Sequence, residues 1–255
     1  MSDTVQAPKV VIDGICKSYE TEQGTLGILD NIRFQVAEGE FICLLGPSGC
    51  GKSTLLNIIA GFESSQSGEI RIDGEVVKGP DPRRVFVFQE LGIFPWMTVW
   101  DNIAIGLAGQ PFEERHRVAM RAIELVGLVG FEKAYPHELS GGMKQRVEVA
   151  RALAVDPDVI YMDEPFGALD SLTRLRMRAE IIRIWTQEQN TILFVTHDIE
   201  ESVQLADRIV IFTDRPAGVR TILSVEMPHP RDIGSPEYMA VRNEVVAAMG
   251  VQQEV

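Results

Sequence analysis

The sequence predicts an α/β domain built on a parallel sheet, with a helical segment inserted into it. Three observations support this fold class. In the second half of the chain, short apolar runs that resemble strands alternate with helical patterns, as in parallel sheets joined by crossover helices. In the first half, a glycine-rich turn follows an apolar run and precedes a helical pattern. Between residues 91 and 155, apolar residues recur three and four positions apart, which is typical of helices.

The first third of the chain is expected to run strand, loop, helix and strand. Alternating or continuous apolar residues over 10–46 predict strands that end at the glycine turn. Helical spacing follows over 52–62. Two shorter segments, 68–74 and 83–90, have the pattern of further strands.

The remainder is expected to hold the helical insert and then the rest of the sheet. Helices are predicted at 99–109, 112–128, 143–155 and 171–189, and strands at 158–165, 191–198 and 207–214. From about residue 220 the sequence predicts a strand, a proline-rich bend and a final helix. We therefore expect one domain over 1–255, with a core of 1–88 and 155–219, a helical subdomain of 89–154 and a C-terminal extension of 220–255.

The composition argues against a nucleic-acid partner. Asp and Glu number 37 against 24 Lys and Arg, which gives a formal net charge of −13, whereas a surface that binds duplex nucleic acid is usually basic. The three cysteines, Cys16, Cys43 and Cys50, lack the paired spacing of a zinc site, and their odd number does not suit a disulfide framework. This cysteine usage fits a reducing cytoplasm.

The chain is expected to be soluble by itself. The first ten residues lack the basic start and apolar segment of a signal peptide. No apolar run approaches the ~18–20 residues needed to span a bilayer. Any role at a membrane must therefore be exercised through a partner.

The segment GPSGCGKST at 46–54 fits the P-loop pattern, and it lies between a strand and a helix as that motif requires. Backbone N–H groups and the helix N-terminus bind phosphate oxygens, a lysine reaches the outer phosphates, and a hydroxyl can ligate magnesium. The expected phosphate-binding residues are Gly46, Pro47, Ser48, Gly49, Cys50, Gly51, Lys52, Ser53 and Thr54, with Ser53 on the metal. Cys50 is either a small loop residue or a thiol whose pKa is lowered by the helix N-terminus and which is therefore oxidisable.

Two carboxylates follow the apolar run VIYM, at Asp163 and Glu164. Side chains at the exit of a parallel strand lie at the edge where ligands bind. Asp163 is expected to hold magnesium directly or through water, and Glu164 to polarise an attacking water. The alternative is that these residues cap a helix, since Asp favours that position.

His197 and Gln89 also follow predicted strands. A neutral imidazole at such an edge can hydrogen-bond a γ-phosphate or the attacking water, although a lone histidine is often structural. Gln89 can approach magnesium or water, and its alternative is a surface amide that caps the strand.

Together with three further motifs, these residues resemble the ATPase subunits of ATP-binding cassette (ABC) transporters, over residues 10 to about 214. In that comparison VIYMDEP is the Walker B strand, LSGGMKQR at 139–146 is the signature, and GALD at 167–170 is the D-loop. Gln89 and His197 match the Q-loop glutamine and the switch histidine. The resemblance implies a RecA-like P-loop core with an N-terminal antiparallel β-subdomain and an inserted α-helical subdomain. It also implies ATP and Mg²⁺ as cofactors, catalysis by Lys52, Glu164 and His197, and an adenine stacked on Tyr19, for which core packing is the alternative.

The signature supplies a second glycine turn without a lysine. Ser140 and two glycines begin a predicted helix whose free N–H groups form an anion site. The resemblance implies that two copies assemble head to tail, so that Ser140, Gly141, Gly142 and Met143 of one copy cover the phosphate bound by the other. Met143 stands where the wider family more often has Gln. Asp170 would lie at the seam of this homodimer, and the alternative for LSGG is a plain helix cap.

The resemblance also implies an integral membrane permease as partner. The aromatic cluster over 91–103, with Phe94, Trp96 and Trp100, is its candidate contact, and core packing is the alternative for each ring. This cluster and the tail resemble import ATPases of the nitrate, sulfonate and taurine group. We therefore expect an importer ATPase for a small anion, served by a solute-binding protein and peripheral on the inner face of the plasma membrane. The alternatives are another ABC system, for lipid or export, and a P-loop ATPase without a transport role.

Overall fold

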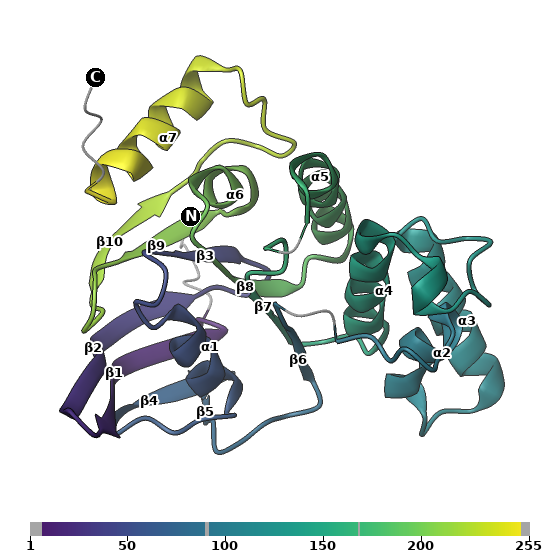
Figure 1. The fold of residues 1–255 in the computed structure, drawn as a ribbon, viewed down its shortest axis with the longest axis horizontal. Helices are drawn as coiled ribbons and strands as arrows, with labels where there is room; N and C mark the ends of the chain where they lie inside the picture. Colours follow the sequence, from purple (N-terminus) through teal and green to yellow (C-terminus); the bar gives the residue numbers. More distant parts are fainter. Residues whose placement is uncertain (1–6, 90–91, 168, 251–255) are drawn as a thin grey trace, which may run out of the picture. The chain divides into compact units, whose positions relative to one another are not determined.

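The computed structural model describes residues 7–89, 92–167 and 169–250. By their internal contacts these residues form two compact units, of which unit 1 takes in 1–81 and 189–255 and unit 2 takes in 82–188. Figure 1 shows the elements of both units along the chain. The predicted boundaries at 89, 155 and 220 do not coincide with this division, because unit 2 groups two strands and a long helix with the helices of the expected insert. The partition into core, subdomain and extension therefore stays a prediction.

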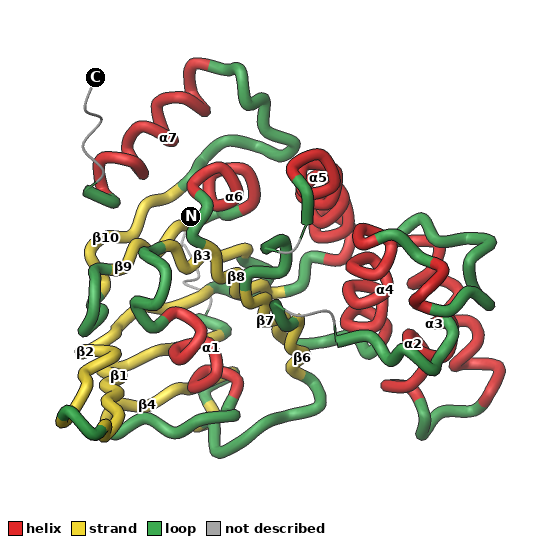
Figure 2. Tube along the Cα trace, in the orientation of Figure 1, coloured by secondary structure: helices red, strands yellow, loops and turns green. Residues whose placement is uncertain are grey.

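Unit 1 contains the expected N-terminal antiparallel sheet, whose strands run side by side in Figure 2. Its strands, in the spatial order β2-β1-β4-β5, are β2 (Gly24–Val36), β1 (Val10–Thr21), β4 (Ser67–Ile72) and β5 (Glu75–Val76). Alternate residues at the start of β1, such as Val10 and Ile12, are buried, which fits a sheet with one covered face. Gly68 has a φ of +82°, and a Cβ there would lie 2.3 Å from the carbonyl oxygen of Gly14. Only glycine fits this close approach of two strands.

A second group of strands in unit 1 carries the apolar runs that the sequence assigns to the core. In the order β10-β9-β3-β8 these are β10 (Val219–Ser224), β9 (Arg208–Phe212), β3 (Phe41–Leu45) and β8 (Thr191–Thr196). β3 is parallel to both β8 and β9, and β10 is antiparallel to β9. Every residue of β3 is buried, as expected of a strand inside a parallel sheet. The helices of unit 1 are α1 (Lys52–Ala60), α6 (Ile199–Leu205) and α7 (Pro236–Ala248).

Unit 2 combines two parallel strands with a helical cluster. The strands are β6 (Arg84–Val87) and β7 (Val159–Asp163), and the helices are α2 (Val99–Ala104), η1 (Ile105–Leu107), α3 (Phe112–Leu125), η2 (Pro136–Glu138), α4 (Gly141–Ala154) and α5 (Ser171–Glu188). α4 contacts α2, α3 and α5. Ile103, Ile123, Val147 and Ala150 are fully or almost fully buried at these contacts. The fold class predicted from the sequence is confirmed.

The segment after β10 is held against α6, which α7 also contacts. Nη1 of Arg231 donates to the carbonyl oxygens of Val203 and Ala206 at 2.7 and 2.8 Å, at the C-terminal end of α6. Its other nitrogens reach the carbonyls of Met227 and Val225 at 3.1 and 3.2 Å. Burial lowers the pKa of Arg231 to about 10, although the charge of Asp207 opposes the shift. One guanidinium therefore satisfies carbonyl groups that a helix end leaves open.

The Arg231→Met variant tests this attachment. It leaves four carbonyl acceptors without their donor, so we expect the free energy of unfolding to fall by on the order of 3 kcal/mol. Urea denaturation measures the change. The control is Arg220→Met, which removes an exposed guanidinium that donates to the carbonyl of Ala248. Equal losses in the two variants would contradict the role given to Arg231.

Candidate functional site

The P-loop sits between β3 and α1 with the backbone that its glycines permit. Gly49 and Gly51 have φ of +74° and +123°, in the region that disfavours other residues. A Cβ on Gly51 would lie 2.7 Å from Cγ2 of Ile28. The turn therefore needs glycine both for its backbone conformation and for its packing, and α1 begins directly after it at Lys52.

Lys52 is a buried cation without a carboxylate partner among the described residues. Its side chain is only 4% exposed. Nζ donates to the carbonyl oxygens of Gly46 and Pro47 at 2.7 and 2.9 Å, and Sγ of Cys50 lies 4.0 Å away. An ammonium held in the interior by neutral partners is costly unless an anion compensates it. The P-loop residues therefore fit a phosphate group, and the hydroxyl of Ser53 follows directly in the first turn of α1.

Cys50 is not an activated thiol. The residue is buried, and burial raises the pKa of Cys50 while the charge of Lys52 and backbone hydrogen bonds only partly oppose the shift. The interpretation as a thiol with a lowered pKa is therefore wrong. Burial outweighs the helix N-terminus at this position.

β8 brings His197 to the edge of the strand group where the P-loop begins. Leu45 at the end of β3 pairs with Thr196 at the end of β8, so the next residues of the two strands, Gly46 and His197, leave at the same edge. His197 is exposed. Asp198 accepts from the N–H of Glu201 at 3.1 Å as the N-cap of α6. Oγ1 of Thr196 accepts from the N–H of Asp198 and donates to Glu201, which fixes the backbone on both sides of the imidazole.

Unit 2 has a comparable edge, where β6 and β7 end. Val87 pairs with Met162, so Gln89 and Asp163 follow at the same side of the two parallel strands. A Cβ on Gly167 would lie 3.6 Å from Nε2 of Gln89, which places the amide beside the turn that follows Glu164. The structure thus brings Gln89 close to the Asp163–Glu164 turn.

Asp163 and Glu164 do not cap a helix, so that alternative is wrong. Glu164 has a φ of +43°, its carbonyl oxygen accepts from the N–H of Gly167 at 3.0 Å, and α5 begins only at Ser171. A non-glycine residue in this conformation is uncommon and is often found at functional sites. Asp170 caps α5 instead, with Oδ1 accepting from the N–H of Leu172 and Thr173 at 3.1 and 3.0 Å. Ala168, the second residue of the D-loop, lies outside the described residues.

Tyr19 offers an exposed ring near the first turn of α1. The residue is 38% exposed, and Oη donates to Glu63 at 2.5 Å. The hydrogen bond to Glu63 and burial raise the pKa of Tyr19, and a hydrogen bond with Thr54 of α1 opposes the shift. Nζ of Lys17 lies 5.1 Å from the ring centroid. The ring is therefore not core, and its hydroxyl is fixed beside the P-loop helix.

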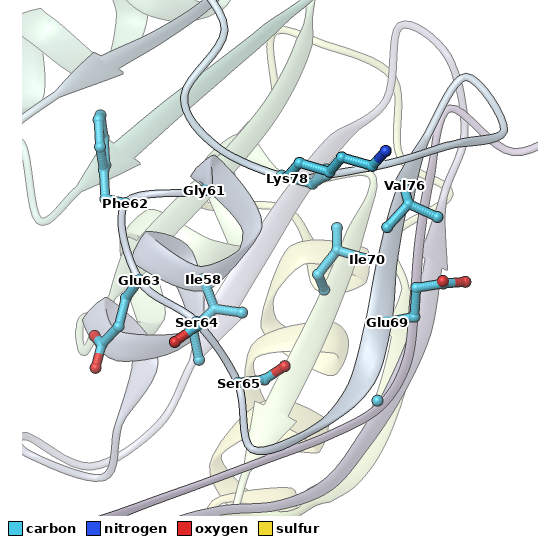
Figure 3. A pocket seen from close by; sticks show the side chains of 12 residues that line it. Ile58, Gly61, Phe62, Glu63, Ser64, Ser65, Glu69, Ile70, Val76 and Lys78 are labelled. Atoms are coloured by element: carbon cyan, nitrogen blue, oxygen red, sulfur yellow. The ribbon is translucent and has the colours of Figure 1, made fainter.

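A cavity of about 330 Å³ lies close by in unit 1. Figure 3 shows the loop of Gly61, Glu63 and Ser65 on one side of it and Ile70 and Val76 on the other. None of the residues that line this cavity is among those predicted to bind nucleotide. It is therefore a feature of the β-sheet packing near Tyr19 and not the predicted phosphate site.

The second glycine turn forms a helix N-terminus, as predicted. Oγ of Ser140 accepts from the N–H of Met143 at 3.3 Å, and α4 begins at Gly141. A Cβ on Gly142 would lie only 2.7 Å from Cγ2 of Thr173 on α5. The turn opens on a cavity of about 230 Å³ lined by Arg146 and Arg176 among others. The helix-cap interpretation and the anion-site interpretation are thus compatible, since a capped N-terminus still presents N–H groups.

Residues 29–167, more than half of the chain, match the family model described as ABC transporter. The chain belongs to the ABC transporter family. Among its relatives is an aliphatic sulfonates import ATP-binding protein, SsuB, of Bacillus cereus, 45% identical over 93% of this chain and 94% of the relative. An ABC transporter ATP-binding protein of Methanocaldococcus jannaschii is also 45% identical, over 93% of this chain and 90% of that protein.

Solved structures agree with this assignment. The ATP-binding cassette MJ0796, in a dimeric post-hydrolysis state bound to ADP and Pi, superposes with a TM-score of 0.74. It is 30% identical, and the match covers 86% of this chain and 100% of that one. The chain is accordingly an ABC ATPase that uses ATP with Mg²⁺, as the sequence predicts. Among the described residues, no helix has both the length and the hydropathy of a bilayer-spanning segment.

The sequence analysis of this ABC ATPase missed the contacts that hold the segment after Gln89. Glu148 is 1% exposed on α4, and Asn102 on α2 is fully buried. The only signal in the sequence is a carboxylate between Val147 and Val149 of the signature helix.

The Gly142→Ala variant separates packing from phosphate binding at the signature. The added methyl meets Cγ2 of Thr173, so we expect a loss of about 1–3 kcal/mol in the free energy of unfolding and a lower melting temperature. Thr173→Ser removes that methyl group but keeps the hydroxyl that hydrogen-bonds Asp170.

In the double variant Gly142→Ala/Thr173→Ser, the melting temperature should recover, whereas the ATPase rate should stay about 10-fold or more below the parental rate. The reason is that the methyl added at position 142 still occupies part of the cavity onto which the start of α4 opens. Recovery of both quantities together would show that Gly142 serves packing alone.

Proposed function

We propose that this ABC ATPase is the ATP-hydrolysing subunit of an importer for a small anion such as nitrate, a sulfonate or taurine. The observation that carries the import assignment is the 45% identity, over almost the whole of both chains, to aliphatic sulfonates import ATP-binding proteins. The aromatic cluster at 91–103 and the tail after Asp214 support the same group. Selection of the solute belongs to a permease and a solute-binding protein in this proposal.

Within one copy, we assign each chemical role to a residue at a strand edge or in the P-loop. Lys52 binds the outer phosphates, and the remaining P-loop residues bind the others through their N–H groups. Ser53, Gln89 and Asp163 hold Mg²⁺, which neutralises phosphate charge when bound. Glu164 polarises the attacking water, and His197 hydrogen-bonds the γ-phosphate. Tyr19 stacks on adenine through its exposed ring.

Two copies complete each site. Ser140, Gly141, Gly142 and Met143 form a helix end that can bind an anion but is not part of a P-loop, which supports binding in trans to nucleotide held by Lys52 of the second copy. Asp170 is exposed at the start of α5, where it is available to a dimer seam. ATP then favours the closed dimer because it binds the closed and open forms with different affinity.

The permease contact is placed on the segment after Gln89. Trp96 is 70% exposed and its ring centroid lies 5.5 Å from that of Phe94, whereas Trp100 is partly buried. Core packing therefore does not account for Trp96. Leu91, at the start of this cluster, lies outside the described residues. Docking here would place the subunit on the inner face of the plasma membrane, without any contact to nucleic acid.

The Glu164→Gln variant tests the catalytic assignment. Because the amide cannot act as a general base, we expect turnover to fall by ~10² to 10⁴ while ATP affinity stays within about 2-fold. A phosphate-release assay and equilibrium nucleotide binding measure the two quantities. Glu244→Gln on α7, an exposed carboxylate, is the control. A variant that hydrolyses ATP at the parental rate removes Glu164 from this role.

The transport proposal is tested in proteoliposomes. The membrane protein that co-purifies with the chain is reconstituted with it, and the solute-binding protein that associates with this complex is supplied on the opposite side. Uptake of radiolabelled taurine, ethanesulfonate and nitrate is measured with ATP on the side of the ATPase. We expect uptake of at least one of them together with a solute-dependent rise in ATP hydrolysis. Export of a preloaded lipid or solute, with no uptake of these anions, would overturn the import assignment and leave the ATPase assignment intact.

A further inference from the structure

Glu148 is a buried carboxylate to which neither the family assignment nor the proposed mechanism gives a role. It lies on α4, eight residues after Ser140, and is 1% exposed. Its Oε1 accepts a hydrogen bond of 3.1 Å from the N–H of Gly92. Gly92 is three residues after Gln89. The signature helix is therefore bonded directly to the backbone of the segment that carries the proposed metal ligand.

Arg151, one turn further along α4, binds the same peptide segment from its carbonyl side. Nη1 donates to the carbonyl oxygen of Gly92 at 2.8 Å. Its guanidinium lies 5.4 Å from the ring centroid of Phe94, and Nη2 is 3.8 Å from Glu148. Both polar backbone groups of Gly92 thus have partners on α4. A Cβ at Gly92 would lie 3.1 Å from Oε1 of Glu148 and 3.3 Å from Nη2 of Arg151, which leaves little room between them.

Asn102 of α2 holds the other end of this segment. Its Oδ1 accepts from the N–H of Phe94 at 2.7 Å, and its Nδ2 lies within 3.1 Å of the carbonyl oxygens of Phe94, Met97 and Thr98. Asn102 is fully buried, so it acts as a fixed point. The segment 92–98 is therefore held by side chains of α2 and α4 that hydrogen-bond its backbone groups. These contacts do not depend on the side chains of the segment itself.

The environment of Glu148 makes its charge sensitive to pH near neutrality. Burial raises the pKa of Glu148 to about 7, against the hydrogen bond from the N–H of Gly92, the charge of Arg151 and the nearby N–H of Phe88. Among the described residues, Arg151 is the charged group that acts on this carboxyl, and the other groups facing it are those two backbone N–H groups. Phe88 and Gly92 flank Gln89 on either side. The carboxyl gains a negative charge as the pH rises through about 7, which strengthens its hydrogen bonds to backbone N–H groups.

We propose that Glu148 and Arg151 are positioning residues that hold the Gln89 segment on the signature helix and so set the amide of Gln89 for Mg²⁺. The pair binds the helix that begins at Ser140 to both backbone groups of Gly92, and the N–H of Phe88 also faces Glu148. This inference rests on the role proposed above for Gln89.

The test is the magnesium dependence of ATP hydrolysis by the full chain. Gln89→Ala should raise the Mg²⁺ concentration for half-maximal rate about 10-fold, the effect of losing one hydrogen-bonding or ligating group. Glu148→Ala should raise it by a similar factor while affinity for ATP without magnesium stays within about 2-fold. Because the two residues act in series, the double variant Glu148→Ala/Gln89→Ala should be no worse than Gln89→Ala alone.

Glu148→Gln keeps an acceptor oxygen for the N–H of Gly92 and should restore the magnesium dependence to within about 2-fold at pH 6.5. The parental enzyme should show a change in magnesium dependence around pH 7 that Glu148→Gln lacks. Glu124→Gln on the neighbouring helix α3, an exposed carboxylate, is the matched control and should match the parent throughout. A merely structural Glu148 would shift stability without this pH step.

If Glu148→Ala fails to fold, the variant Gly92→Ala tests the proposal. Gly92→Ala adds a methyl group close to Glu148 and Arg151 and so disturbs their hydrogen bonds to residue 92. It should therefore reproduce the shift in magnesium dependence. An unchanged magnesium dependence in Gly92→Ala overturns the proposal. Where Glu148→Ala does fold, additive effects of Glu148→Ala and Gln89→Ala overturn it as well. If Gln89→Ala alone leaves the magnesium dependence unchanged, Gln89 does not have the proposed role at Mg²⁺. Glu148 and Arg151 then cannot act on Mg²⁺ through Gln89.

Discussion

The burial of the Lys52 ammonium among neutral carbonyl groups is the constraint on which the site depends. A cation in the protein interior must be compensated, and here the compensation within the described residues is partial, from the carbonyl groups of Gly46 and Pro47 and the sulfur of Cys50. To place those carbonyls around Nζ, the chain must turn sharply between β3 and α1, which requires glycine at 49 and 51. The strand, the turn and the helix together hold the Lys52 ammonium where a phosphate group can bind it.

The remaining polar side chains are arranged by strand ends and helix starts. Parallel pairing of β3 with β8 puts His197 at the edge where the P-loop begins, and parallel pairing of β6 with β7 puts Gln89 beside the turn after Asp163. The N–H groups that α4 presents at Ser140 belong to the same unit as Gln89. Each of the two compact units therefore carries part of the chemistry on its own secondary structure.

Local patterns sufficed to predict most of this arrangement from the sequence. The P-loop and the apolar strands that precede Asp163 and His197 are contiguous in the chain, so spacing alone indicates where their polar residues emerge. The role of the buried Glu148 could not be predicted, because its partner Gly92 is 56 residues away and offers only backbone groups. The role of Arg231 could not be predicted either, because its four acceptors are backbone carbonyl groups, which no side-chain pattern marks in the sequence. The thiol of Cys50 was ambiguous because burial and the helix field act in opposite directions on its pKa.

The hydrogen bond between Tyr19 and Glu63 has a consequence for which nucleoside triphosphates the enzyme can use. Its hydroxyl is already occupied by Glu63, so the face of its ring is what remains for a base. Stacking reads the flat surface of a purine and not the donors and acceptors on its rim, and it is therefore tolerant of the kind of base. In the role proposed for Tyr19, guanosine and inosine triphosphates would be accepted nearly as well as adenosine triphosphate. Which nucleoside triphosphate is hydrolysed would then depend on its concentration in the cell and not on selection by the protein.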